Sequence, residues 1–167
     1  MKELRLIITG GTFDKHYDEI QGKLTFRESH LPRILKQSRC TLTVEIEQPC
    51  HLIDSLYMKE ENRIVIASSC VKSPEEKVIV IHGTDTMVKT AEVIAKNLPA
   101  DDKHIIVITG AMIPYALENS DSVFNLGCAV SAVQMLKPGV WVCMSGKIFE
   151  WNNVVKNKIL GVFETIH

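Results

Sequence analysis

Two stretches decide the fold, Leu6-Ile7-Ile8-Thr9-Gly10-Gly11-Thr12 and Val78-Ile79-Val80-Ile81-His82-Gly83-Thr84-Asp85-Thr86. In each of them an apolar run passes directly into a turn built from glycine and threonine. Such runs are typical of strands buried in a parallel sheet, where ligands bind beyond the carboxyl ends of the strands. The glycines permit a sharp turn with the backbone close to a ligand. We therefore expect the threonine hydroxyls of both turns to face one crevice.

The rest of the chain alternates strand-like and helix-like segments. Strands are expected over residues 42–46, 105–108 and 140–144, with no strand after 144, and helices from about residue 29 and over residues 60–71, 86–98 and 122–136. Asp121 is a natural N-cap for the last helix. This order predicts an α/β fold, a three-layer, Rossmann-like or flavodoxin-like, mostly parallel sheet with helices on both faces. The polar segment 13–25 is too long for a tight turn and predicts a flap or hairpin over the crevice.

Length and charge narrow the class of ligand. A chain of 167 residues with 46% hydrophobic content suits a single domain, residues 1–167. Lys and Arg total 19 against 20 Asp and Glu, for a net charge of -1, so no basic field attracts nucleic acid or an anionic membrane. A small-molecule substrate is expected. The amino terminus lacks the features of a signal peptide, and no apolar segment is long enough to span a bilayer, so we expect a cytoplasmic protein.

Cofactor and metal motifs are missing from the sequence. The chain has no phosphate-binding or dinucleotide-binding glycine motif and no Gly-x-Ser-x-Gly, so no cofactor is expected. Its six histidines lack metal-ligand spacing, so we expect no metal. The five cysteines are scattered and form no Cys-x-x-Cys pair, which is typical of reduced thiols rather than of a disulfide framework.

A threonine nucleophile needs a group that takes its proton. A lysine near an aspartate is the best candidate, because burial lowers the pKa of an amine and lets it accept a proton from a hydroxyl. Asp85 follows Thr84 directly, and Lys156 lies beyond the last expected strand. Composition alone does not choose Lys156 over Lys15 or Lys89.

Several of these segments, taken in order, resemble the bacterial-type L-asparaginases, the asparaginase/glutaminase family, in their short single-domain form. The resemblance runs from Leu6 to about Phe163, and its motifs are Thr9-Gly10-Gly11-Thr12, Asp54-Ser55-Leu56-Tyr57-Met58, His82-Gly83-Thr84-Asp85-Thr86, Gly110-Ala111-Met112-Ile113-Pro114 with Ser120-Asp121 and Asn125-Leu126, and Val154-Val155-Lys156. The shared order carries the resemblance, because each motif alone also fits an ordinary turn, a helix cap or a surface lysine.

The resemblance implies roles for individual residues. Thr12 would attack the side-chain amide carbon of L-asparagine and form an acyl-enzyme, with Tyr17 of the flap as the match to a tyrosine that contacts the nucleophile. Thr84, Asp85 and Lys156 would form a second polar triad, with Asp85 also receiving the substrate ammonium group. The expected substrate contacts are Asp54, Ser55, Gly11, Gly83 and Ala111, with Ser55 holding the α-carboxylate and backbone N–H groups at the strand ends stabilising the oxyanion.

The chain also departs from the family pattern. Ile113 stands where many relatives have arginine, Ser122 where glycine is usual and Tyr57 where aspartate is common. Larger relatives have a second domain that lends an acidic residue to a neighbouring subunit, and 167 residues leave no room for one. We therefore expect asparagine to be needed at millimolar concentration, about -4 kcal/mol of binding. We also expect a homodimer or higher homo-oligomer, with Trp141 to Met144 and Trp151 as candidate surface residues.

The sequence thus predicts an amidohydrolase that converts L-asparagine to L-aspartate and ammonia. Two alternatives stay open at this point. One is a catalytically silent domain that senses asparagine or aspartate, against which Lys156 argues, because binding alone has no need of it. The other is a deamidase subunit that acts on an amino acid attached to a larger carrier, which the near-neutral charge disfavours.

Overall fold

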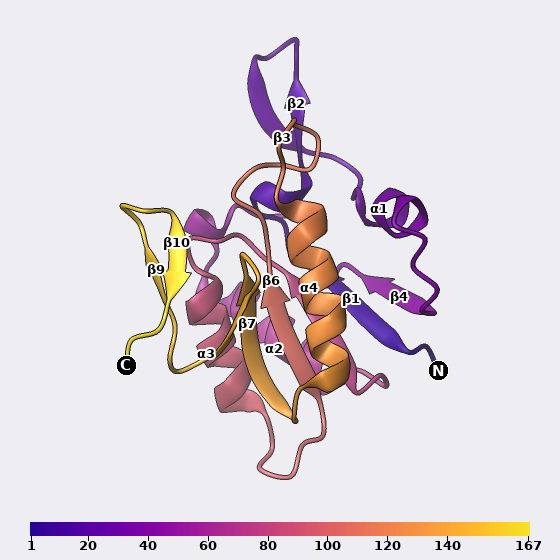
Figure 1. Cartoon of the computed structure of the whole chain (residues 1–167), viewed down its shortest axis with the longest axis vertical. Helices are drawn as coiled ribbons and strands as arrows, with labels where there is room; N and C mark the ends of the chain where they lie inside the picture. The colour runs from indigo at the N-terminus through magenta and orange to yellow at the C-terminus, as the bar shows by residue number, and fades with distance from the viewer.

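A six-stranded sheet forms the centre of the protein. The computed structural model describes residues 1–167, and its strands stand in the order β4-β1-β5-β6-β7-β8 (Figure 1). Their bounds are β1 Leu4–Ile8, β4 Val44–Glu47, β5 Lys77–Ile81, β6 Ile105–Thr109, β7 Gly139–Met144 and β8 Lys147–Glu150. The first five strands run parallel, and β8 pairs antiparallel with β7. The order of the parallel strands is that of flavodoxin-like sheets, as predicted.

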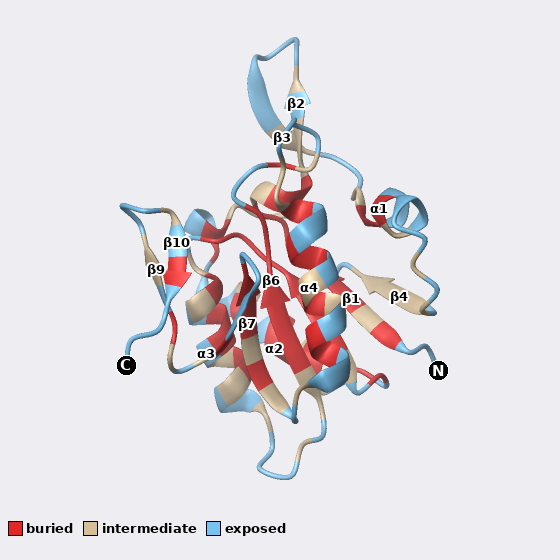
Figure 2. Ribbon diagram, viewed as in Figure 1, coloured by how far each residue is buried: buried red, intermediate tan, exposed pale blue.

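Helices connect the parallel strands and cover both faces of the sheet. They are α1 Leu31–Gln37, α2 Glu60–Val71, α3 Met87–Asn97 and α4 Ser122–Met135. Side chains of β5 alternate between the two faces: Val78 and Val80 pack in one core cluster with α2 and α3, while Ile79 and Ile81 pack in the other with α1 and α4. Figure 2 shows the sheet buried between these layers, with α4 across the near face. None of the helices combines the length and the apolar character that a membrane crossing requires.

Two hairpins project from the edge of the sheet at which the parallel strands end. The first, β2 Lys15–Asp18 with β3 Lys23–Phe26, is the predicted flap. The second, β9 Val155–Asn157 with β10 Val162–Glu164, follows the sheet in sequence. Figure 1 shows β2–β3 above the sheet and β9–β10 beside it. The expectation of no strand after residue 144 was therefore wrong, because β8, β9 and β10 lack the long apolar runs of the buried strands.

Two further expectations about single elements need correction. The strand expected from residue 42 begins at Val44, since Leu42 lies before the paired segment. Asp121 occupies the N-cap position of α4, but its carboxylate makes no capping bond and instead accepts hydrogen bonds from the N–H groups of Met112 and Ile113.

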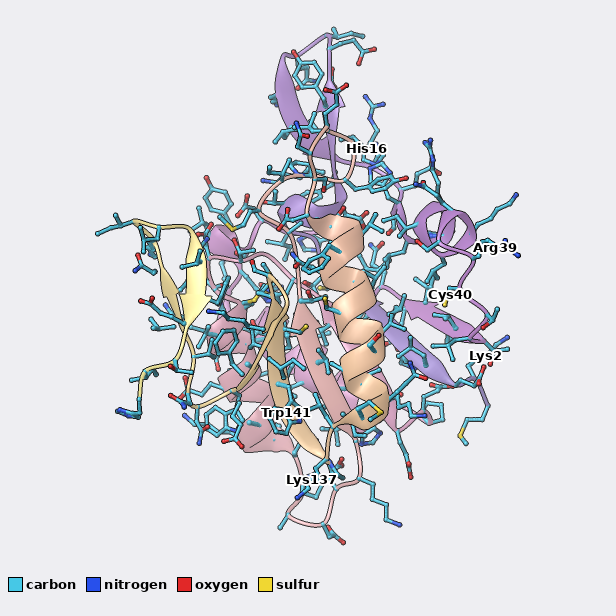
Figure 3. All side chains as sticks on the ribbon, viewed as in Figure 1. Lys2, His16, Arg39, Cys40, Lys137 and Trp141 are labelled. Carbon is cyan, nitrogen blue, oxygen red and sulfur yellow. The ribbon has the colours of Figure 1, made fainter.

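The expected oligomer surface at Trp141 to Met144 is also wrong. Val142, Cys143 and Met144 are buried in the sheet, so they are not available to a partner. Trp141 is half-buried and donates its indole N–H to the carbonyl of Lys137. Figure 3 shows these two residues together at the end of the molecule away from the β2–β3 hairpin.

Candidate active site

The two glycine turns touch each other through their backbones. Gly11 has a φ of 78°, and a Cβ there would overlap the N and Cα atoms of Gly83. A Cβ at Gly83 would in turn overlap the Cβ and Oγ atoms of Ser55. Only glycine permits these close approaches. The turns after β1 and β5 and the segment around Ser55 therefore meet at one place, as the sequence predicted for the two turns.

An isolated bridge brings the Ser55 segment to the turns. After β4 the chain leaves the sheet and returns at Ile53, which pairs in parallel with Gly10. The N–H of Gly11 donates to the carbonyl of Ile53 at 3.1 Å, and the N–H of Ile53 donates to the carbonyl of Thr9 at 3.0 Å. Asp54 and Ser55 follow immediately, and Ser55 opens the short 3-10 helix η2, Ser55–Tyr57.

Lys156 of β9 reaches the second turn from a distant part of the chain. Its Nζ atom donates to Thr84 Oγ1 at 2.8 Å and to Asp85 Oδ1 at 2.7 Å. The Lys156 side chain is 11% exposed, whereas the Asp85 side chain is 36% exposed. The three residues therefore form one hydrogen-bonded cluster that opens to solvent on the Asp85 side, as expected from the sequence.

The other two candidate lysines lie elsewhere. Lys15, at the root of the β2–β3 hairpin, forms an ion pair with Asp54 at 2.5 Å. Burial opposes ionisation of Asp54, but hydrogen bonds from Lys15 and from the N–H of Leu56 outweigh it and hold the pKa of this carboxyl below its usual value. The pair therefore ties the hairpin to the Ser55 segment. Lys89 is exposed on α3.

The side chains of Thr12, Tyr17 and Ala111 make no hydrogen bond to the cluster of Thr84, Asp85 and Lys156. Thr12 opens the short helix η1, Thr12–Asp14, directly after Gly11, and remains partly accessible. Tyr17 lies on β2 with 53% of its surface exposed, and its hydroxyl makes no hydrogen bond to Thr12 or to any other residue. Ala111 is fully buried, with its methyl group in the core beside α4.

His82 supports the second turn from inside the core. Its Nδ1 donates to the carbonyl of Gly83 at 2.9 Å, and its Nε2 accepts from the Thr90 hydroxyl at 2.7 Å. A carbonyl oxygen can only accept, so Nδ1 carries a proton, and in the neutral ring Nε2 accepts from the Thr90 hydroxyl. Burial lowers the pKa of His82 to about 4, so the imidazole stays neutral near pH 7.

Sequence reasoning missed Arg63, which joins two of the converging segments through Thr86 of the second motif. Arg63, on the first turns of α2, is 6% exposed and donates from Nη1 to the carbonyl of Met58 at 2.8 Å and from Nη2 to Thr86 Oγ1 at 3.0 Å. Thr86 donates in turn to the carbonyl of Ser55 at 2.9 Å. No carboxylate pairs with Arg63, and its Nε atom has no partner. An arginine in a helix pattern ordinarily indicates a solvated position, so the sequence holds no signal for this role.

Asp121 and Asn125 organise the segment after β6. Asp121 accepts from the N–H groups of Met112 and Ile113, as described, and from Asn125 Nδ2 at 2.9 Å. Asn125 is fully buried, donates to the carbonyl of Gly110 at 3.0 Å and accepts from the N–H of Ser145 at 3.0 Å. One asparagine thus joins the ends of β6 and β7. No group of three or more His, Cys, Asp or Glu side chains is arranged to hold a metal ion.

Fold and site together define a class of protein, a flavodoxin-like α/β domain that gathers two threonine-bearing turns, a lysine and an aspartate beyond the ends of its strands. Residues 3–163 match the model of the family described as asparaginase, N-terminal. The chain therefore belongs to the asparaginase family, as its motifs indicated.

Individual relatives agree with this assignment. An L-asparaginase from Thermococcus kodakarensis is 29% identical over 69% of this chain and 36% of its own length. A glutamyl-tRNA(Gln) amidotransferase subunit from Archaeoglobus fulgidus is 30% identical over 87% of this chain and 35% of its own length. Among solved structures, a probable cytoplasmic L-asparaginase from Campylobacter jejuni superposes with a TM-score of 0.82 and 28% identity over 99% of this chain and 53% of that one. The chain thus spans about a third of the curated relatives and about half of the solved one.

Proposed function

We propose that this protein is an amidohydrolase that converts L-asparagine to L-aspartate and ammonia. The observation that carries the proposal is the pair of hydrogen bonds from Lys156 Nζ to Thr84 and Asp85, beside the turn that presents Thr12. A mostly buried lysine side chain held between a hydroxyl and a carboxylate is an arrangement suited to moving protons at a nucleophile. Membership of the asparaginase family supports the same reaction.

In the proposed reaction the Thr12 hydroxyl attacks the side-chain amide carbon of asparagine. The carbon–nitrogen bond breaks, ammonia leaves with the proton that the threonine gave up, and an aspartyl ester remains on Thr12. Water then adds to the ester, which releases aspartate and restores the hydroxyl. Thr84 and Lys156 carry the proton, while Asp85 holds Lys156 in place and receives the substrate ammonium group.

Substrate contacts are assigned to the segments that converge on the site. Ser55 and the Asp54–Lys15 pair lie on the side where the α-carboxylate would bind, and Gly11, Gly83 and the main chain at Ala111 border the expected oxyanion. Tyr17 would have to approach Thr12 by a movement of the β2–β3 hairpin, whose strands are joined to each other but not to the main sheet. Ammonia release that is unchanged in Tyr17→Phe would remove this residue from the mechanism.

The first test is the release of ammonia by purified protein. Thr12→Ala and Lys156→Met should each lower asparagine hydrolysis by about a thousandfold or more with the fold intact, because members of a catalytic unit act together. Lys89→Met is the matched control, since Lys89 is exposed on α3 and should be dispensable. Absence of ammonia release by the wild-type protein would leave an asparagine sensor as the better proposal. Full activity of Thr12→Ala would assign the nucleophile to Thr84.

A second candidate function is a deamidase component that supplies or transfers an amide group. It is favoured by the Archaeoglobus fulgidus relative, which is named for glutamyl-tRNA(Gln) amidotransferase and aligns with a larger share of this chain than the Thermococcus kodakarensis L-asparaginase does. Ammonia release from glutamine that exceeds release from asparagine would support this candidate over the first.

We also propose a cytoplasmic location. All five cysteines are free in the structure, which suits a reducing compartment. The Campylobacter jejuni relative is described as a probable cytoplasmic L-asparaginase. Fractionation of cells with an antibody against the protein would test this, and recovery outside the cytoplasm would contradict it.

A further inference from the structure

The β9–β10 hairpin, which carries Lys156, stands apart from the main sheet. Its two strands pair with each other and with no strand of the six-stranded sheet (Figure 1). A two-stranded ribbon of this kind is at most marginally stable in water by itself. Contacts of its side chains with the rest of the molecule therefore determine where the ribbon lies, and with it the main chain of Lys156.

Phe163 is the one residue of these two strands that is buried. It is 3% exposed and belongs to the core cluster that also contains Met87 of α3 and Val142 of β7. Its neighbours in β10, Val162 and Glu164, are exposed. Figure 2 shows the buried part of β10 next to exposed parts of the hairpin. The ring of Phe163 thus holds β10 against the core.

Lys156 lies directly opposite Phe163 in the register of the hairpin. Residues that face each other across an antiparallel pair have their side chains on the same face of the ribbon. The ring that enters the core and the lysine that enters the candidate site therefore leave the ribbon on one side. Lys156 is also the only residue of β9 and β10 whose side chain makes a hydrogen bond outside the hairpin.

Two further contacts hold the base of the hairpin. Val154, directly before β9, is 2% exposed and lies in the same core cluster as Phe163. Asn153 Oδ1 accepts hydrogen bonds from the N–H groups of Ile166 and His167, each at 3.0 Å. These residues lie outside the paired strands. They fix the base of the ribbon and leave the tilt of the strands to Phe163.

We propose that Phe163 is a positioning residue for Lys156, and that its buried ring sets the tilt at which Lys156 Nζ reaches both Thr84 and Asp85. A lysine side chain is a flexible stem, so its ammonium is well placed only if its main chain is. The hydrogen bonds are 2.8 Å and 2.7 Å long, and a shift of about 1 Å away from the two partners takes both beyond hydrogen-bond length. The catalytic consequence of this positioning rests on the proposed function.

Chemical labelling of lysines tests the positioning without any assay of activity. The Lys156 side chain is 11% exposed while it is bound to Thr84 and Asp85. In folded Phe163→Ala, acetic anhydride should acetylate Lys156 about tenfold faster than in the wild-type protein, because the released ammonium spends more time in solvent. Mass spectrometry follows the reaction, with exposed Lys158 at the tip of the same hairpin as the internal reference.

Val162→Ala is the matched control. Val162 is 38% exposed and, as the next residue along the strand, points away from the face that carries Phe163, so its truncation should leave the labelling of Lys156 unchanged. Phe163→Leu keeps a large apolar side chain in the core and should bring the labelling rate to within about threefold of the wild-type rate. Circular dichroism shows whether each variant is folded. If Phe163→Ala is not, Phe163→Val replaces it, with a smaller increase expected in the same direction.

Kinetics of asparagine hydrolysis give a second measurement if the proposed function holds. Phe163→Ala should lower kcat by about tenfold, because the proton carrier is displaced. In a Lys156→Met background the same substitution should lower the remaining ammonia release by less than about twofold, since Phe163 acts through Lys156. A merely structural role would give the same factor in both backgrounds.

Unchanged labelling of Lys156 in folded Phe163→Ala overturns the proposal, and so does an equal loss of kcat with and without Lys156. Faster labelling together with an unchanged kcat supports the positioning of Lys156 and contradicts its role in the proposed reaction. The two failures are therefore distinguishable.

Discussion

His82 contributes to the site through the backbone that it supports rather than through contact with a substrate. Its neutral ring holds the carbonyl of Gly83 on one side and the Thr90 hydroxyl on the other. A proton added to Nε2 would remove the acceptor for Thr90 and place a charge in the core beside the buried Arg63. The residue that begins the second motif is therefore a structural histidine whose protonation state matters.

The pKa of His82 predicts a defined loss of stability in acid. The ordinary value is 6.5 and the folded value is about 4, so between these limits the unfolded chain binds a proton that the folded chain does not. The free energy of unfolding therefore rises with pH across this window. As the pH falls from 6.5 to 4, the contribution of His82 to this free energy decreases by up to roughly 3 kcal/mol. Urea unfolding of the wild-type protein at pH 7 and pH 5 measures the loss.

His82→Asn is the appropriate comparison for that measurement. Its amide can still donate toward the carbonyl of Gly83 but takes up no proton in this range. Carboxylates such as Asp54 titrate in both proteins, so their contribution cancels in the difference. The variant should lose less stability than the wild-type protein between pH 7 and pH 5, and equal losses would show that His82 is not responsible.

At the scale of elements, Arg63 connects helix α2 with the two segments that border Ser55. It holds the carbonyl at the end of η2 and, through Thr86, the carbonyl at its beginning. Arg63→Met keeps most of the side-chain volume and removes both bonds. We expect faster amide hydrogen exchange over residues 55–58 and, if the proposed function holds, kcat/KM for asparagine lower by about tenfold.

Exposed Glu61 on the same helix provides the control, because Glu61→Gln should change neither quantity. Arg63→Lys should fall between the wild-type protein and Arg63→Met, since an ammonium retains the charge but not the forked geometry. Unchanged exchange over residues 55–58 in Arg63→Met would mean that Ile53 and Gly10 hold this segment without help.

The elements that sequence predicted well are those with strong periodicity. The helix expected over residues 86–98, with its apolar stripe, is α3, Met87–Asn97, and the apolar runs at Ile105 and Val78 lie in central strands. The hairpin β9–β10 was missed because its strands have only three residues each, too few to show an alternating pattern, although Phe163 of β10 is buried. Lys156 was found from its place in an ordered set of motifs, whereas Arg63 was not found, because its burial depends on carbonyls that only the folded loops supply.

On the scale of the whole molecule, the ion pairs of Arg5 that join the strands of the sheet lie away from the candidate site. Arg5 on β1 pairs with Glu47 of β4 and, at 2.8 Å, with Glu75, which lies just before β5. Burial opposes ionisation of Glu75, but hydrogen bonds from Arg5 and from the N–H of Lys2 prevail and lower the pKa of this carboxyl. The pairing of Arg5 and Glu75 lies toward the edge where β1 and β5 begin, whereas Thr12 and Thr84 follow the edge where those strands end.

This separation predicts that stability and activity can be changed independently. Glu75→Gln leaves Arg5 with only Glu47, and breaking a mostly buried pair should lower the free energy of unfolding by about 2 kcal/mol. Because Glu75 lies before β5 and the candidate site lies after it, kcat/KM for asparagine, if the proposed function holds, should stay within about twofold of the wild-type value in the folded variant. Glu76→Gln, at the exposed neighbouring position, should change neither. Urea unfolding and ammonia release measure the two quantities, and a large loss of activity in folded Glu75→Gln would show that the two edges of the sheet are coupled.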